Sequence, residues 1–186
     1  MNGIFVAVVG PSGVGKDSLI GFARDRLAAD GDVVFVRRVV TRQAEVTSED
    51  HDSMDPAAFA DAEARGEFAL SWGAHGLRYG LPIGLEMDLS AGRVVVANLS
   101  RGVIPELLRR YPEAIVVSVT AEREVITHRL AQRGRESAEA IQQRLDRAVV
   151  GDRLPASTVR IDNSGVLAVA GEQIVALLKD AMGVRA

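Results

Sequence analysis

The sequence contains no cysteine among its 186 residues, so disulfide bonds and thiolate metal centres are both excluded. Aromatic residues are scarce, at 4% of the chain, with a single tryptophan at position 72. No apolar stretch approaches the length of about 20 residues that crosses a bilayer. The first strand-like run begins at residue 4, which leaves no room for a secretion signal. We therefore expect a cytoplasmic protein that does not act at a membrane.

An excess of charge of one sign is also lacking. The 22 basic and 25 acidic residues give a formal net charge of −3, so the whole chain has no attraction for nucleic acid or for an anionic membrane. The hydrophobic content of 47% fits one domain with a good core. Small-molecule substrates are the partners that this composition favours, and it leaves the oligomeric state open, a homodimer included.

Strand-like and helix-like segments alternate along the chain. Apolar, β-branched runs predict buried strands at residues 4–9, 33–40, 94–98, 114–119 and 158–161. Helical spacing of apolar residues predicts helices at 17–29, 105–110, 121–132, 137–150 and 166–182. This alternation predicts an α/β fold of three layers around a mostly parallel, five-stranded sheet.

Residues 43–82 interrupt the alternation. A polar stretch is followed by a short helix at 56–65 with Asp55 as its cap, and then by a hairpin of 68–72 and 77–79. Such an insertion would cover the carboxyl end of the sheet, where open α/β folds bind ligands. We expect a single domain over 1–186, with a core of 1–42 and 83–186.

The segment Gly10-Pro-Ser-Gly-Val-Gly-Lys-Asp-Ser18 joins the first strand to the first helix. It matches the phosphate-binding loop pattern G-x-x-x-x-G-K-[ST] except at Asp17. Its glycines let backbone N–H groups turn toward a polyphosphate at the positive end of a helix, and Lys16 reaches the β- and γ-phosphates. The fold is therefore expected to be that of a P-loop NTPase. The expected ATP-binding residues are Gly10, Pro11, Ser12, Gly13, Val14, Gly15, Lys16, Asp17 and Ser18.

Arginines gather at two places near this loop. Arg38 and Arg42 lie at the end of the second predicted strand, and Arg129, Arg133, Arg135 and Arg144 occupy a later helix, the break at Gly134 and the next helix. A single such arginine is as often a surface residue, but phosphoryl transfer needs positive charge around the phosphates. The Arg-Gly-Arg break between two helices predicts a lid that closes over the triphosphate and excludes water.

The order of these motifs resembles the guanylate kinase-like group of P-loop kinases. The matching pieces are Gly10 to Lys16, Thr41-Arg42, Gly76, Tyr79-Gly80, Arg129-Leu130, Arg133-Gly134 and Arg144-Leu145. The resemblance implies a nucleoside-monophosphate-kinase architecture with an acceptor-binding insertion at about 43–82 and a helical lid at about 133–144. It adds Arg129 and Asn163 to the ATP site, although Asn163-Ser-Gly is also an ordinary turn. Catalysis would rest on Lys16, Arg133, Arg135 and Arg144.

The chain departs from guanylate kinases where those enzymes read guanine. Leu70 and Leu81 stand at the positions of a glutamate and a hydroxyl residue, and leucine cannot hydrogen-bond a base. Glu45 replaces a second arginine, and Asn98 lies in the segment where the acidic residues of the third strand are expected. GMP is therefore a poor candidate substrate.

The same departures resemble the ribose 1,5-bisphosphate phosphokinases of phosphonate breakdown. The segments Lys16-Asp-Ser, Phe68-Ala-Leu-Ser-Trp and Arg133-Gly-Arg-Glu carry this resemblance. It implies transfer of the ATP γ-phosphoryl group to the 1-phosphate of α-D-ribose 1,5-bisphosphate, giving 5-phosphoribosyl 1-diphosphate (PRPP) and ADP. A kinase for another phosphorylated metabolite or nucleotide is one alternative. A non-catalytic binding module is the other, although such modules typically lose the lysine of the loop.

A bisphosphorylated sugar presents two dianions and several hydroxyls but no base, so its pocket needs arginines and small polar groups. The expected substrate-binding residues are Arg38, Arg42, His75, Tyr79, Asn98, Ser100 and Arg101. Trp72 and Tyr79 have a second interpretation, as packing residues of the hairpin. Asp17 replaces the hydroxyl that usually binds Mg²⁺, and it predicts a magnesium ligand unless it only complements the helix dipole.

Overall fold

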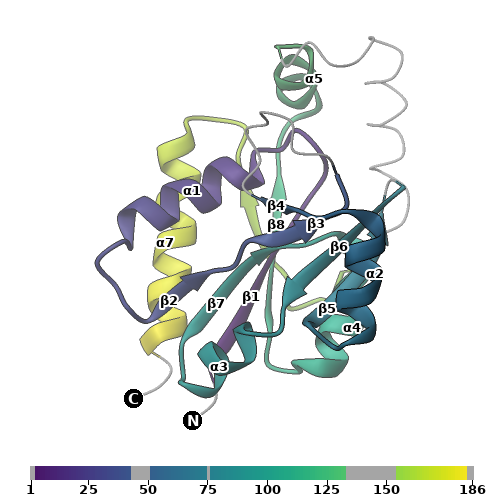
Figure 1. Ribbon diagram of the computed structural model, residues 1–186. Helices are drawn as coiled ribbons and strands as arrows, with labels where there is room; N and C mark the ends of the chain where they lie inside the picture. The colour runs from purple at the N-terminus through teal and green to yellow at the C-terminus, as the bar shows by residue number, and fades with distance from the viewer. Residues whose placement is uncertain (1–2, 43–50, 75, 133–153, 184–186) are drawn as a thin grey trace.

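The computed structural model describes residues 3–42, 51–74, 76–132 and 154–183. Its central sheet has five strands in the order β2-β7-β1-β8-β9, all parallel (Figure 1). The strands are β1 (Ile4–Val9), β2 (Val33–Phe35), β7 (Val94–Asn98), β8 (Ile115–Thr120) and β9 (Val159–Asp162). The predicted α/β fold with a parallel five-stranded sheet is confirmed.

Helices cover both faces of this sheet (Figure 1). On one face, α1 (Lys16–Arg26) and α7 (Leu167–Gly183) pack over Val6 and Val8 of β1. On the other, Phe5 and Ala7 pack with α3 (Leu85–Ser90) and α4 (Ile104–Arg110). This alternation along β1 follows from the period of two of a strand. No helix among the residues that the structure describes is long and apolar enough to span a membrane.

The helices predicted at 17–29, 105–110, 121–132 and 166–182 are confirmed as α1, α4, α5 (Arg123–Gln132) and α7. The helix expected at 137–150 lies outside the described residues. The sequence analysis did not predict α3 or the single turn η1 (Arg101–Val103).

A second sheet of four strands has the order β4-β3-β6-β5. Its strands are β3 (Arg38–Val40), β4 (His51–Ser53), β5 (Phe68–Ala74) and β6 (Leu77–Pro82). The prediction of one strand over 33–40 is therefore wrong, because β2 ends at Phe35 in the central sheet and the chain crosses to the second sheet at Arg38. The run reads as one strand because both halves are β-branched. The predicted hairpin is confirmed as β5 and β6, which pair antiparallel.

The second sheet lies between the core and α2 (Pro56–Ala64). Asp55 caps α2 as predicted, since its Oδ1 accepts from the Ala57 N–H at 2.8 Å. On the α2 side, Phe59 stacks on Phe68, and a Cβ at Gly80 would lie 2.6 Å from the Phe68 ring. The opposite face of β5 and β6 is buried against the central sheet and α4. That buried face carries the aromatic and leucine residues considered next.

Candidate nucleotide and acceptor sites

The phosphate-binding loop follows β1 and ends at Gly15, the N-cap residue of α1. Gly13 and Gly15 have φ angles of 83° and 92°, which lie in the left-handed region that favours glycine. The Lys16 ammonium donates to the carbonyl oxygens of Gly10 and Pro11, at 2.8 and 3.0 Å. The loop thus has the required strand and helix on either side, and its lysine curls back over it.

Two predicted nucleotide residues contact the loop from outside. The Val14 carbonyl oxygen accepts from Asn163 Nδ2 at 2.8 Å and from an Arg129 guanidinium nitrogen at 3.3 Å. Asn163 is only 2% exposed, and its backbone N–H donates to the Thr120 carbonyl at 2.8 Å. A Cβ at Gly15 would lie 2.5 Å from Asn163 Nδ2. The Asn163 amide therefore packs directly on the loop and supports its shape.

Asp17, the irregular residue of the loop, meets the carboxyl end of β7. The Asn98 amide donates from Nδ2 to Asp17 Oδ1 at 2.7 Å. Asn98 is 8% exposed, and its Oδ1 has no hydrogen-bond partner among the described residues. A cavity of about 40 Å³ adjoins the pair, with Arg24 and Arg38 also in its wall. The carboxylate gained in the loop and the amide on β7 are thus spatial neighbours.

The predicted acceptor residues Arg38, Tyr79 and Ser100 belong to one continuous chain of contacts. The Arg38 guanidinium carbon lies 5.6 Å from the centroid of the Tyr79 ring. Tyr79 in turn stacks on Trp72, with centroids 5.4 Å apart and planes 10° apart. Trp72 Nε1 donates to Ser100 Oγ at 2.9 Å. This series of contacts links β3 to β6, β6 to β5, and β5 to Ser100, two residues after the end of β7. Sequence reasoning favoured Trp72 as a packing residue and missed its bond to Ser100.

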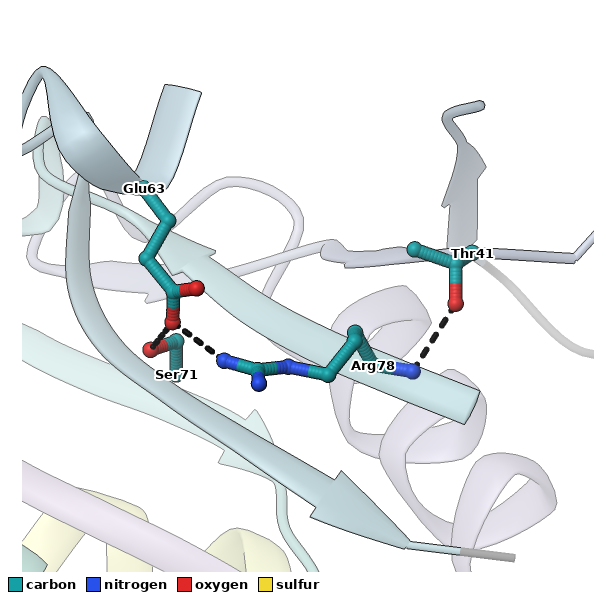
Figure 2. A network of polar contacts seen from close by, with 4 residues as sticks. All are labelled: Thr41, Glu63, Ser71 and Arg78. Atoms are coloured by element: carbon teal, nitrogen blue, oxygen red, sulfur yellow. Dashed lines mark hydrogen bonds and ion pairs between the residues drawn. The ribbon is translucent and has the colours of Figure 1, made fainter. Parts of the chain in front are cut away.

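Arg42 follows a residue that is fixed at the end of β3. Thr41 Oγ1 accepts from the Arg78 backbone N–H at 2.8 Å, and the Thr41 N–H donates to the Arg78 carbonyl at 3.0 Å. Figure 2 shows the Arg78 guanidinium turned to Glu63 of α2, whose carboxylate also accepts from Ser71 Oγ. The two hydrogen bonds between Thr41 and Arg78 extend the pairing of β3 with β6 by one residue beyond Val40. No sequence signal marked Glu63 or Arg78, since their partners are distant in the chain.

Several predicted residues are not brought into view. Four of them, together with the expected lid at about 133–144, lie outside the described residues: His75, Arg133, Arg135 and Arg144. Arg101 begins η1 directly after Ser100 and is partly exposed. Ser12 and Ser18 are exposed at the loop. Across residues 3–42, 51–74, 76–132 and 154–183, no group of three acidic or histidine side chains could hold a metal ion.

A central parallel sheet with this loop, and a second sheet packed on the face that carries Phe5 and Ala7, define the guanylate kinase-like P-loop fold. The fold agrees with solved structures. The guanylate kinase from Anaplasma phagocytophilum superposes with a TM-score of 0.69 at 16% identity, over 97% of this chain and 87% of that one. A gluconokinase from Sinorhizobium meliloti 1021 gives a TM-score of 0.53 at 17% identity, over 98% and 94% of the two chains.

Sequence relatives narrow the class to a family. The ribose 1,5-bisphosphate phosphokinase PhnN of Chelativorans sp. (strain BNC1) is 47% identical over 181 residues, 97% of this chain and 87% of that protein. The same-named protein of Pseudofrankia inefficax is 48% identical over 97% of this chain and 93% of its own length. That of Brucella melitensis biotype 2 is 52% identical over 88% and 85%. The chain belongs to the ribose 1,5-bisphosphate phosphokinase family, which confirms the resemblance of its motifs. No general family model matches it.

Proposed function

We propose that this protein transfers the γ-phosphoryl group of ATP to the 1-phosphate of α-D-ribose 1,5-bisphosphate, forming PRPP and ADP. The observation that carries the proposal is an acceptor side with cationic and small polar groups but with leucine where guanine would be read. Leu70 and Leu81 are 3% and 0% exposed on the inner face of the hairpin. A buried leucine offers no partner to a base edge, whereas a sugar bisphosphate requires none there.

The acceptor would lie between the second sheet and the carboxyl end of β7. Arg38 and Arg42, at the start of β3 and just past its end, would bind its phosphates, since guanidinium groups match phosphate oxygens in pairs. Asn98, Ser100 and Arg101 would supply the remaining polar contacts from the opposite side. ATP would occupy the loop, with its β- and γ-phosphates next to Lys16.

The transfer needs little covalent chemistry from the protein. An oxygen of the 1-phosphate attacks the γ-phosphorus and forms the new P–O bond. The bond from that phosphorus to the β,γ-bridging oxygen breaks, and ADP leaves with its electron pair. The attacking oxygen is already ionised, so no general base is required. The protein therefore contributes orientation and positive charge, with Lys16 placed to balance the charge that develops toward ADP.

The residues at Asp17 fit a magnesium ion. The Asp17 carboxylate is oriented by Asn98 beside a cavity, and the second amide oxygen of Asn98 is buried without a partner among the described residues. Oxygen ligands of this kind suit Mg²⁺. Asp17 would hold the ion, directly or through water, and Asn98 would set the orientation of the carboxylate. The ion would supply neutralisation of the polyphosphate charge.

Product analysis tests the proposal. The protein is incubated with ATP, Mg²⁺ and either ribose 1,5-bisphosphate or GMP, and PRPP and GDP are measured. We expect PRPP and at most a trace of GDP, and GDP without PRPP would refute the assignment. If ADP is released but neither PRPP nor GDP forms, the protein only hydrolyses ATP. In the variant Arg42→Ala, the KM for the acceptor should rise far more than the KM for ATP, and equal increases would remove Arg42 from the acceptor site.

Exchange of the two polar groups tests the magnesium site. Asp17→Asn should raise the Mg²⁺ concentration needed for half-maximal turnover by about tenfold, because a charged ligand becomes neutral. The double variant Asp17→Asn with Asn98→Asp returns a carboxylate to the same pair and should recover part of that loss. Binding of Mn²⁺ in the presence of ADP, followed by electron paramagnetic resonance, should change in the same order. An unchanged metal requirement in Asp17→Asn would exclude the site.

A further inference from the structure

Trp72 is the single tryptophan of the chain, and it contacts two of the residues expected to bind the acceptor, Ser100 and Tyr79. It is 8% exposed, and its indole N–H reaches Ser100 Oγ at 2.9 Å, across 28 positions of sequence. A buried indole N–H needs a partner, but backbone carbonyls serve that need as well as a serine. Because its partner is Ser100, a residue expected to bind the acceptor, this hydrogen bond can affect substrate binding as well as packing.

The bond fixes what the Ser100 hydroxyl can do. An indole nitrogen donates and cannot accept, so Ser100 Oγ must be the acceptor in this contact. One lone pair of the hydroxyl is then directed at Trp72, and its single proton must point away from the indole. An oxygen of a phosphate or of a sugar can accept a hydrogen bond from that proton. Ser100 is therefore oriented as a donor before any substrate arrives, which lowers the ordering cost of binding.

The other side of the indole makes a second link. Trp72 stacks on Tyr79, and the Arg38 guanidinium carbon lies 5.6 Å from the centroid of the Tyr79 ring. A guanidinium over an aromatic ring loses part of its rotational freedom, so the ring restricts where its charge can lie. The indole thus stands between a hydroxyl donor and a cation, both of which belong to the expected acceptor site.

We propose that Trp72 is a positioning residue for the acceptor: it orients the Ser100 hydroxyl by its N–H and supports Arg38 through Tyr79. The inference rests on the proposed function, because it assigns these residues to the phosphorylated sugar. It also makes the emission of Trp72 a direct report on acceptor binding, with no contribution from another tryptophan.

The variant Trp72→Phe keeps an aromatic ring for the stack and deletes the N–H. We expect the KM for ribose 1,5-bisphosphate to rise about fivefold, the range of one neutral hydrogen bond, while the KM for ATP changes less than twofold. Ser100→Ala removes the same bond from the other partner and leaves the stack in place. If Trp72 acts through Ser100, then adding Trp72→Phe to Ser100→Ala should produce little further increase in this KM. Full additivity of the two substitutions would overturn the inference.

Fluorescence supplies a readout that does not depend on turnover. Titration of the wild-type protein with ribose 1,5-bisphosphate, without ATP, should shift or quench Trp72 emission, and Ser100→Ala should have a shifted resting emission and a smaller response. An acceptor that binds by calorimetry without any change in emission would contradict the placement of Trp72. Because Ser100→Ala leaves the indole in place, this arm survives even if Trp72→Phe proves unstable.

A matched control deletes one aromatic hydrogen bond near the start of β1, whereas the phosphate-binding loop follows the end of that strand. Tyr111 donates to Glu86 at 2.7 Å and stacks on Phe5, at 5.3 Å between centroids. Tyr111→Phe should leave both KM values and the Trp72 emission response unchanged. A wild-type protein that forms no PRPP would refute the proposed function and this inference together. PRPP formation with normal acceptor kinetics in Trp72→Phe would overturn the role of Trp72 alone.

Discussion

Replacement of Gly15 by alanine tests how the phosphate-binding loop is supported. Gly15 has a φ of 92°, where an alanine is strained by about 1–2 kcal/mol. Its new Cβ would also lie 2.5 Å from Asn163 Nδ2, so the amide must withdraw from the Val14 carbonyl and lose a hydrogen bond worth about 1 kcal/mol. The two effects together lower the free energy of unfolding by about 2–3 kcal/mol. For a chain of this length that corresponds to a fall of about 4–12 °C in Tm.

Thermal unfolding followed by circular dichroism measures this loss, and Gly21→Ala is the control. Gly21 lies in α1, and a Cβ there meets nothing within 4 Å in the part of the chain that the structure describes. Alanine is the better helix former, so Gly21→Ala should raise stability by up to about 1 kcal/mol. Gly15→Ala should also weaken ATP binding, because it displaces the loop backbone, whereas Gly21→Ala should leave ATP binding unchanged.

A double-mutant cycle with Asn163→Ala separates the two causes. Once the amide is removed, Gly15→Ala should lower stability only by the conformational part, about 1–2 kcal/mol. An equal loss in both backgrounds would refute the reasoning, since the contact between Gly15 and Asn163 would then contribute nothing.

Three further outcomes follow from single contacts. Lys16→Met should lower kcat by at least about 100-fold, measured as ADP release, because positive charge on the phosphates is lost. The Tm should fall by only about 2–8 °C, with the loss of the two hydrogen bonds to Gly10 and Pro11. Gly171→Ala should lower the free energy of unfolding in urea by about 1–3 kcal/mol, since its Cβ would lie 2.5 Å from the Phe22 ring. Burial and the hydrogen bond to Glu86 raise the pKa of Tyr111 above its ordinary value. The stability that this phenol contributes is therefore fully present below about pH 10 and declines as the pH rises toward the raised pKa, and Tm measured from pH 8 to 11 should fall more in the wild type than in Tyr111→Phe.

Local motifs were predictable because their physics is local. The loop from Gly10 to Ser18 was recognised from its glycines, its lysine and the strand before it. Strands β1, β7 and β8 followed from β-branched runs that are buried on both faces of the sheet. The cap at Asp55 and the hairpin were predictable for the same reason. Each of these features is determined by residues within a few positions of one another.

Contacts between distant residues were not predictable in the same way. Asp17 was recognised as irregular, but its partner Asn98 is 81 positions away, and nothing in either segment names the other. Trp72 and Ser100 have the same relation. The break between β2 and β3 was missed because Val33 to Val40 reads as one apolar run, although Arg37 and Arg38 interrupt it where the chain changes sheets.

All four strands of the second sheet, together with α2, fall within residues 38–82 of the sequence. A single segment of this kind can be exchanged between related kinases as a cassette, in order to change the acceptor that the enzyme uses. Trp72 sits inside that cassette, yet its hydrogen-bond partner Ser100 stays behind in the core. The smallest transplantable unit of specificity is therefore residues 38–82 together with Ser100, and a graft without that serine would deliver the indole without its partner.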